Sequence, residues 1–193
     1  PQAVTKVRVF AYEPELARRR KEYEGIEAHP LRFRSDELGA EHWEILIKPP
    51  SAQAEYMDIT RDIIQKLFYQ ERLTFKNLLK HVQTDDRLSD SQRRRALNRM
   101  SFAERWISDD RAYSWEDVLD EGSINIVDLR IQTLDSSEAL KLCLIVTDLV
   151  RRARNGVNKV IVFDEAHEYV DCKELVGELE NAITQIRHDG LSF

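Results

Sequence analysis

The segment from Val160 to Phe163 constrains the fold most, because four consecutive apolar residues run directly into two carboxylates, Asp164 and Glu165. Strands that are buried on both faces of a parallel sheet have unbroken apolar runs of this kind, whereas half-exposed strands alternate. We therefore expect residues 160–163 to form a central strand. Ligands of parallel sheets bind at the carboxyl ends of the strands, which places both carboxylates at a binding edge. The alternative is a strand that simply ends in a solvated turn.

The rest of the chain predicts the alternation of strands and helices that is typical of a parallel α/β sheet. Residues 5–11 are predicted as a strand, residues 14–23 as a helix and residues 31–33 as a short extended stretch. A further strand is expected at residues 124–129. Asp135, with Glu138 three residues later, predicts the start of an apolar helix that reaches about residue 154. An amphipathic helix is expected after the 160–163 strand, with Leu175, Leu179, Ile183 and Ile186 on its apolar face.

A long helical segment interrupts this pattern. Apolar residues recur at the helical period between residues 54 and 68, again from Phe75 to Val82, and in a third helix that begins near Asp90. We interpret residues 51–120 as an all-helical insertion. Residues 1–50 are then the first part of the α/β core, and residues 121–193 are its second part.

Composition and charge narrow the class of protein. A formal net charge of −6 argues against a uniformly basic surface that coats nucleic acid, but not against a local basic channel. Cys143 and Cys172 lack metal-site or redox-motif spacing, so we expect reduced thiols in a cytoplasmic protein. No apolar run is long enough to span a membrane. Because the chain begins at Pro1 and ends in residues typical of a strand, we expect it to be a piece of a larger protein.

The residues at the end of the 160–163 segment suggest nucleotide chemistry. The run looks like the Walker B motif of a P-loop NTPase, in which an Asp holds Mg²⁺ with the nucleotide and a neighbouring Glu orients or activates water. Asp164 is therefore the candidate for binding Mg²⁺ and ATP, and Glu165 is the candidate catalytic residue. His167 is a candidate for relaying the state of the nucleotide, although a structural hydrogen-bonding role is the favoured interpretation. Arg187 is a candidate for contacting phosphates, and attraction to the helix dipole explains it equally well.

Two other charged groups have simpler explanations. Asp128 follows a predicted strand and is expected to cap a turn, although it also faces the same edge of the sheet. Five arginines between residues 93 and 105 form a basic stretch for which the favoured interpretation is a solvated helix face and the alternative is contact with DNA. These are Arg93, Arg94, Arg95, Arg99 and Arg105.

The order of segments resembles that of the HerA/FtsK-type ATPases. The resemblance rests on a strand that ends in Asp, a long apolar helix, the sequence Asp-Glu-Ala-His at residues 164–167, and an Arg-x-x-Gly segment at residues 187–190. It is strongest at residues 160–167 and weak before residue 50. It implies a RecA-like core, Mg-ATP hydrolysis, a ring hexamer and translocation on double-stranded DNA, often beside a nuclease. It also implies Walker B roles for Asp164 and Glu165 and an arginine role for Arg187.

One part of the family pattern is missing. No GxxxxGK[ST] sequence occurs in these residues, because no lysine is followed by Ser or Thr. We therefore expect this chain alone to bind nucleotide poorly, and two explanations remain. The phosphate loop lies before Pro1, or the protein is a degenerate, non-hydrolysing ATPase-fold scaffold. A DEAH-type nucleic-acid helicase is a further alternative, although the Ser-Ala-Thr segment typical of those proteins does not occur before Phe193.

Overall fold

The computed structural model describes residues 6–49, 55–110, 112–131, 134–154, 156–164 and 177. The chain divides into two compact units. The first unit consists of Pro1–Leu31 and Tyr113–Phe193, and the second consists of Arg32–Ala112. The predicted insertion at residues 51–120 overlaps most of the second unit, but this unit begins and ends earlier in the sequence. Residues 32–50, which were predicted as part of the α/β core, belong to the second unit, and residues 113–120, which were predicted as part of the insertion, belong to the first.

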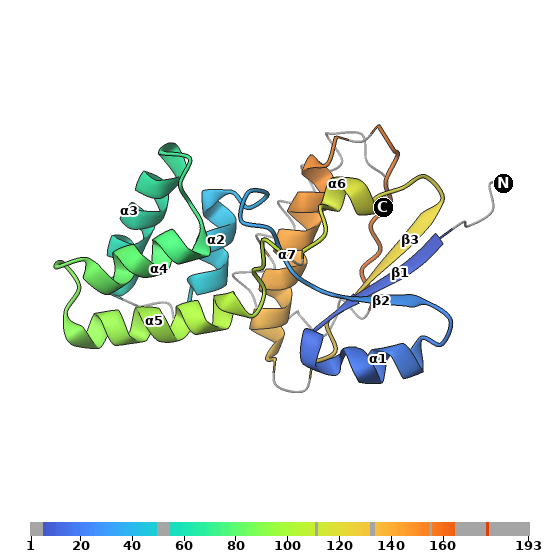
Figure 1. Cartoon of the computed structure of the whole chain (residues 1–193), viewed down its shortest axis with the longest axis horizontal. Helices are drawn as coiled ribbons and strands as arrows, with labels where there is room; N and C mark the ends of the chain where they lie inside the picture. The colour runs from blue at the N-terminus through green and yellow to red at the C-terminus, as the bar shows by residue number, and fades with distance from the viewer. Residues whose placement is uncertain are drawn as a thin grey trace. The chain divides into compact units, whose positions relative to one another are not determined.

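A parallel sheet forms the centre of the first unit (Figure 1). Its three strands are β1 (Lys6–Ala11), β2 (Glu27–Pro30) and β3 (Ser123–Asp128), in the order β2-β1-β3. Both pairings are parallel. The short 3-10 helix η1 (Glu13–Glu15) and helix α1 (Leu16–Glu22) connect β1 to β2. The predicted α/β class with a parallel sheet is therefore confirmed at this level.

The two faces of the sheet follow from the alternation of side chains along β1. Val9 and Ala11 point to the face that α1 covers, where they pack with Leu16 and Ala28. Arg8 and Phe10 point to the other face. Phe10 contacts Trp115 there, with ring centroids 5.4 Å apart. Trp115 begins the short helix α6 (Trp115–Val118).

Helix α7 (Ser136–Arg152) follows β3 and is buried along most of its length. Its predicted start is confirmed, because the Asp135 side chain accepts a hydrogen bond of 2.8 Å from the Glu138 backbone N–H. Cys143 lies on this helix as a free thiol, and burial raises its pKa to about 11. Cys172 lies outside the described residues. Among the described residues, no helix has the length and apolar character needed to cross a membrane.

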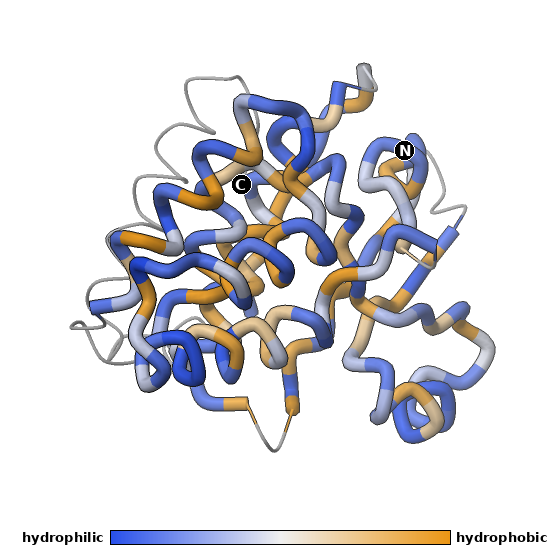
Figure 2. The backbone as a smooth tube through the Cα atoms, turned by 60° about the vertical axis from the view of Figure 1, so that its left-hand side comes forward, coloured by the Kyte–Doolittle hydropathy of each residue, from blue (hydrophilic) through white to orange (hydrophobic). Residues whose placement is uncertain are grey.

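Four helices make up most of the second unit: α2 (Ala40–Ile47), α3 (Tyr56–Tyr69), α4 (Phe75–Thr84) and α5 (Asp90–Glu104). Hydrophobic and hydrophilic residues alternate in short stretches along the helices, as expected for amphipathic segments (Figure 2). The largest buried side chains include Trp43, Trp106, Ile64, Leu67, Leu78 and Met100. Ser89 caps α5 in a capping box with Gln92, which agrees with the predicted helix start near residue 90.

The short extended stretch predicted at residues 31–33 is displaced in the structure. The strand β2 comes earlier, and Ala28 in it pairs with Val9 of β1. Phe33 forms only an isolated bridge with Ile107. The shift has a simple cause, because parallel pairing with β1 satisfies the backbone of Glu27–Pro30 and leaves Phe33 to a local contact in the second unit.

Candidate functional site

The carboxyl ends of the three strands meet at one edge of the sheet. Ala11 of β1 pairs in register with Pro30 of β2 and with Asp128 of β3. Asp128 is the only one of the three with an ionisable side chain, and that side chain is 1% exposed. The edge at which parallel sheets generally bind ligands therefore contains a buried carboxylate in the described part of this sheet.

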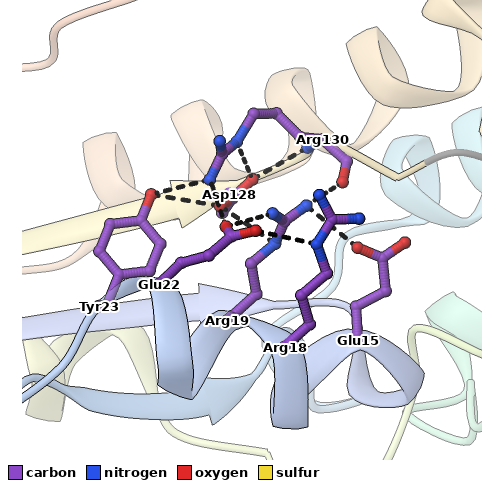
Figure 3. Close-up of polar contacts among 7 residues, drawn as sticks. All are labelled: Glu15, Arg18, Arg19, Glu22, Tyr23, Asp128 and Arg130. Carbon is purple, nitrogen blue, oxygen red and sulfur yellow. Dashed lines mark hydrogen bonds and ion pairs between the residues drawn. The ribbon is translucent and has the colours of Figure 1, made fainter.

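Two arginines neutralise Asp128 (Figure 3). Arg130 donates from Nε to Oδ1 at 3.0 Å and from Nη2 to Oδ2 at 2.5 Å. Arg19 approaches from α1, and its Nε lies 3.2 Å from Oδ2. The Tyr23 hydroxyl donates a further hydrogen bond of 3.2 Å to the same oxygen. The carboxylate thus has partners on both oxygens, which come from α1, from the turn after α1 and from the residues after β3.

The network continues along α1 through residues one helical turn apart. Arg19 is 2% exposed and binds Glu15 at 3.0 Å and Glu22 at 2.6 Å. Its guanidinium also donates to the backbone carbonyl of Arg130. Arg18 binds Glu22 from the outer side at 2.9 Å. With Asp128 and Arg130, the junction contains three positive and three negative side chains and is electrically balanced.

The electrostatics of the junction favour the ionised form of Asp128. Burial raises the pKa of this carboxyl, but hydrogen bonds from the side chain and backbone of Arg130 and the charges of Arg130 and Arg19 outweigh it, so the pKa is lowered. The pKa of Tyr23 is raised, first by burial and then by the neighbouring negative charge of Asp128. Both groups therefore keep their ordinary charge states near neutral pH.

This arrangement makes the Asp128 cluster a structural junction. The backbone N–H of Arg130 donates to Oδ1 at 3.0 Å, which is the turn-capping role that the sequence predicted for Asp128. Because Arg19, Arg130 and Tyr23 occupy its oxygens, the carboxylate is not available as a base or as a metal ligand in this arrangement. Its effect is to tie α1 to the end of β3.

The predicted central strand at residues 160–163 is wrong as a description of this structure. Val160 forms only an isolated bridge, and residues 161–163 have no regular secondary structure. The exposed fractions are 64% for Val160 and 81% for Val162, the opposite of burial on both faces. An apolar run specifies a strand only where a neighbouring strand satisfies its backbone, and the described sheet has the order β2-β1-β3.

Of the predicted site residues, only Asp164 lies within the described part of the chain. It occupies a turn directly after Phe163 and is exposed. A single carboxylate fits Mg²⁺, which binds proteins through one or two carboxylates together with the phosphates of its substrate. Glu165, His167 and Arg187 lie outside the described residues, as do Leu175 and Ile186 of the predicted helix, in which Gly177 is described and is helical.

The basic stretch of α5 separates into two groups. Arg93 donates to the carbonyls of Asp85 and Leu88, at 2.8 and 3.0 Å. Arg99 donates to the carbonyls of Leu46 and Lys48, at 3.3 and 3.1 Å, and so caps the end of α2. These two side chains support the helical unit.

The remaining arginines of the basic stretch, two in α5 and one directly after it, are exposed. Arg105 lies over the ring of Phe102, with 5.9 Å from Cζ to the centroid. Arg94 and Arg95 are exposed. The favoured interpretation of a solvated helix face therefore fits Arg94 and Arg95, whereas Arg93 and Arg99 have structural partners.

Sequence reasoning did not identify Arg19, Arg130 and Tyr23 as members of a cluster. Part of the signal was present, because Glu15, Arg19 and Glu22 have the spacing of ion pairs along a helix. The contact of Arg19 with Asp128 joins residues more than a hundred positions apart, and no local pattern predicts it.

Comparisons with known proteins give no match: no family model, no curated protein sequence and no solved structure corresponds to this chain. Its candidate function therefore rests on its own residues and their geometry.

Proposed function

We propose that this chain is part of an ATP-hydrolysing DNA translocase or helicase with a RecA-like core. The observation that carries the proposal is the order of elements around the sheet. Parallel strand β3 leads through α7 to the apolar run and the carboxylates of residues 160–165. A strand, a helix and an apolar run that ends in Asp-Glu is the order in which P-loop NTPases present their Walker B residues.

In this proposal Asp164 holds Mg²⁺ with the nucleotide and Glu165 activates the attacking water. Arg187 stabilises the charge that develops on the phosphates, and His167 contacts the nucleotide site. The Lys and Ser/Thr that bind phosphate must come from a segment outside this sequence, because the chain contains no GxxxxGK[ST]. Double-stranded DNA, a ring hexamer and a nuclease partner belong to the same proposal.

The proposal requires residues 160–163 to pair with neighbouring strands in the active protein. Insertion into a parallel sheet whose faces are covered by helices would bury the side chains of Val160 and Val162 that are exposed in this chain. This pairing would bring Asp164 to the same edge of the sheet as Asp128, where parallel sheets bind their ligands.

The decisive experiment measures ATP hydrolysis with and without DNA in the complete protein that contains this chain. Replacing Glu165 by Gln keeps the size of the side chain but removes its ability to accept a proton. We expect hydrolysis to fall at least about a hundredfold while ATP binding is retained. The matched control is Glu168→Gln, three residues further along the sequence, which is expected to retain activity.

Two results would count against the proposal. If the complete protein does not hydrolyse ATP in the presence of DNA, the motor function is excluded and the non-hydrolysing scaffold replaces it. If Glu165→Gln and Glu168→Gln hydrolyse ATP equally well, Glu165 is not the catalytic carboxylate. Stimulation by single-stranded RNA in place of double-stranded DNA would favour the DEAH-type alternative.

A further inference from the structure

Two aromatic side chains stand out on the surface of the second unit. Tyr69 is 81% exposed and Phe68 is 43% exposed at the end of α3. Their rings lie edge to face, with centroids 6.0 Å apart and an interplanar angle of 72°. Water contact with aromatic rings is unfavourable, so an exposed pair at a helix end indicates a binding surface more often than scattered apolar residues do.

A short turn connects α3 to α4 directly after Phe68 and Tyr69 (Figure 1), and hydrogen bonds hold its backbone. The N–H of Glu71 donates to the Phe68 carbonyl and the N–H of Arg72 donates to the Leu67 carbonyl, both at 2.9 Å. The Asn77 side chain donates to the Arg72 carbonyl at 2.8 Å. Glu71 adopts a positive φ of 55°, which is uncommon for a residue with a side chain. The turn is therefore ordered before any ligand binds.

Basic residues flank the turn in the sequence, and the turn itself contains one exposed carboxylate, that of Glu71. Helix α4 contains no Asp or Glu, and its exposed residues Lys76 and Lys80 are one helical turn apart. Arg72 and Lys66 are exposed on the residues that lead into α4. Within the described part of the chain, no ion pair involves any of these four side chains, whereas Arg61 and Arg87 of the same unit bind carboxylates.

The net charge of the second unit agrees with the basic residues near the α3–α4 turn. Arg32–Ala112 contains 15 Lys and Arg against 14 Asp and Glu, a net charge of +1. Because the full chain carries −6, the other unit carries −7. The basic surface of α4 therefore belongs to the less acidic unit of an acidic protein, where attraction of an anionic partner is least opposed.

We propose that the α3–α4 turn and the exposed face of α4 bind single-stranded nucleic acid. Unpaired bases stack on Tyr69 and Phe68, and the phosphates lie against Arg72, Lys76 and Lys80. Exposed aromatic rings beside a row of cations are the features that bind single strands without sequence preference. A duplex hides its base faces, so it uses the cations alone and binds this surface more weakly. The proposal goes beyond the ATPase function and needs no nucleotide.

The test measures fluorescence anisotropy of a labelled oligothymidylate of about 16 nucleotides, titrated with the full 193-residue chain at about 50 mM salt. Tyr69→Ala is expected to weaken binding about tenfold. Tyr69→Phe keeps the aromatic face and is expected to bind within about twofold of the unaltered chain. Circular dichroism checks that each variant folds. Because Tyr69 is exposed, we expect its replacement to leave the fold intact.

Paired charge variants test the phosphate contacts. Replacing Lys76 and Lys80 together by Ala removes two cations, so the slope of log K against log salt is expected to become shallower by about 1.4. The control replaces Arg94 and Arg95 together by Ala. This removes the same charge from an exposed face of α5 in the same unit. This control is expected to change affinity and slope much less.

Several outcomes would overturn the proposal. The proposal is wrong if the unaltered chain does not bind the oligothymidylate at about 50 mM salt. It is also wrong if Tyr69→Ala binds as tightly as Tyr69→Phe. Equal losses in the two charge variants would indicate general attraction to basic residues instead of a specific surface. If sedimentation shows a dimer that Tyr69→Ala dissociates, the aromatic pair is an interface between two copies of the chain.

Discussion

Asp128 and Asp164 occupy the same kind of position in the sequence but have opposite environments in the structure. Each follows a run of apolar residues, Ile126-Val127 in one case and Val162-Phe163 in the other. Asp128 is buried and neutralised by two arginines, whereas Asp164 lies exposed in a turn. An apolar run that ends in Asp therefore does not define a role by itself. The burial of the carboxylate and the elements that pack around it decide whether it supports the fold.

The largest expected effect comes from removing the buried carboxylate. Asp128→Ala leaves the guanidinium of Arg19 buried with one counter-charge fewer, removes the acceptor of the Tyr23 hydroxyl and removes the closer of the two carboxylates that Arg130 binds. We expect the free energy of unfolding to fall by about 3 kcal/mol, as is usual when one partner of a buried ion pair is lost. Urea denaturation of the chain, followed by circular dichroism, measures this change.

Asp164→Ala is the matched control for that experiment. Since Asp164 is exposed, its replacement is expected to change stability by less than about 0.5 kcal/mol. Equal effects of the two substitutions would show that the burial and ion pairs of Asp128 do not make it more important for stability than Asp164.

A smaller loss of folding stability is expected when the pH is lowered. The folded-state pKa of Asp128 is lowered, so the stability that its ionisation provides is present above its ordinary pKa of about 3.9 and is lost as the pH falls towards the lower folded value. Asp128→Asn cannot ionise and lacks this component. Its stability should therefore decrease less than that of the unaltered chain between about pH 4 and pH 2. Parallel pH curves for the two proteins would exclude a contribution from Asp128.

Local patterns predicted much of the fold. The starts of β1, α5 and α7 were recognisable from an apolar strand run, from the helical period of apolar residues that begins near Asp90, and from the Asp135 cap. The pairing of Arg19 with Asp128 was not predictable, since it depends on β1 and β3 lying side by side. For the same reason the 160–163 segment was predicted wrongly. Its composition specifies a buried strand, but burial depends on neighbouring strands that its own sequence does not supply.

The smallest effect on the stability of the chain is expected from replacing Val162. The same replacement is the sharpest test of the role proposed for Asp164. Because this side chain is 81% exposed, Val162→Ser should change the unfolding free energy of the chain by less than about 0.5 kcal/mol. In the complete protein the proposed strand would bury the same side chain, and Val162→Ser should then lower both stability and ATP hydrolysis. Val157→Ser, outside the apolar run, provides the comparison. If Val162→Ser is neutral in both settings, the segment does not enter a sheet, and Asp164 lacks the strand that the nucleotide site requires.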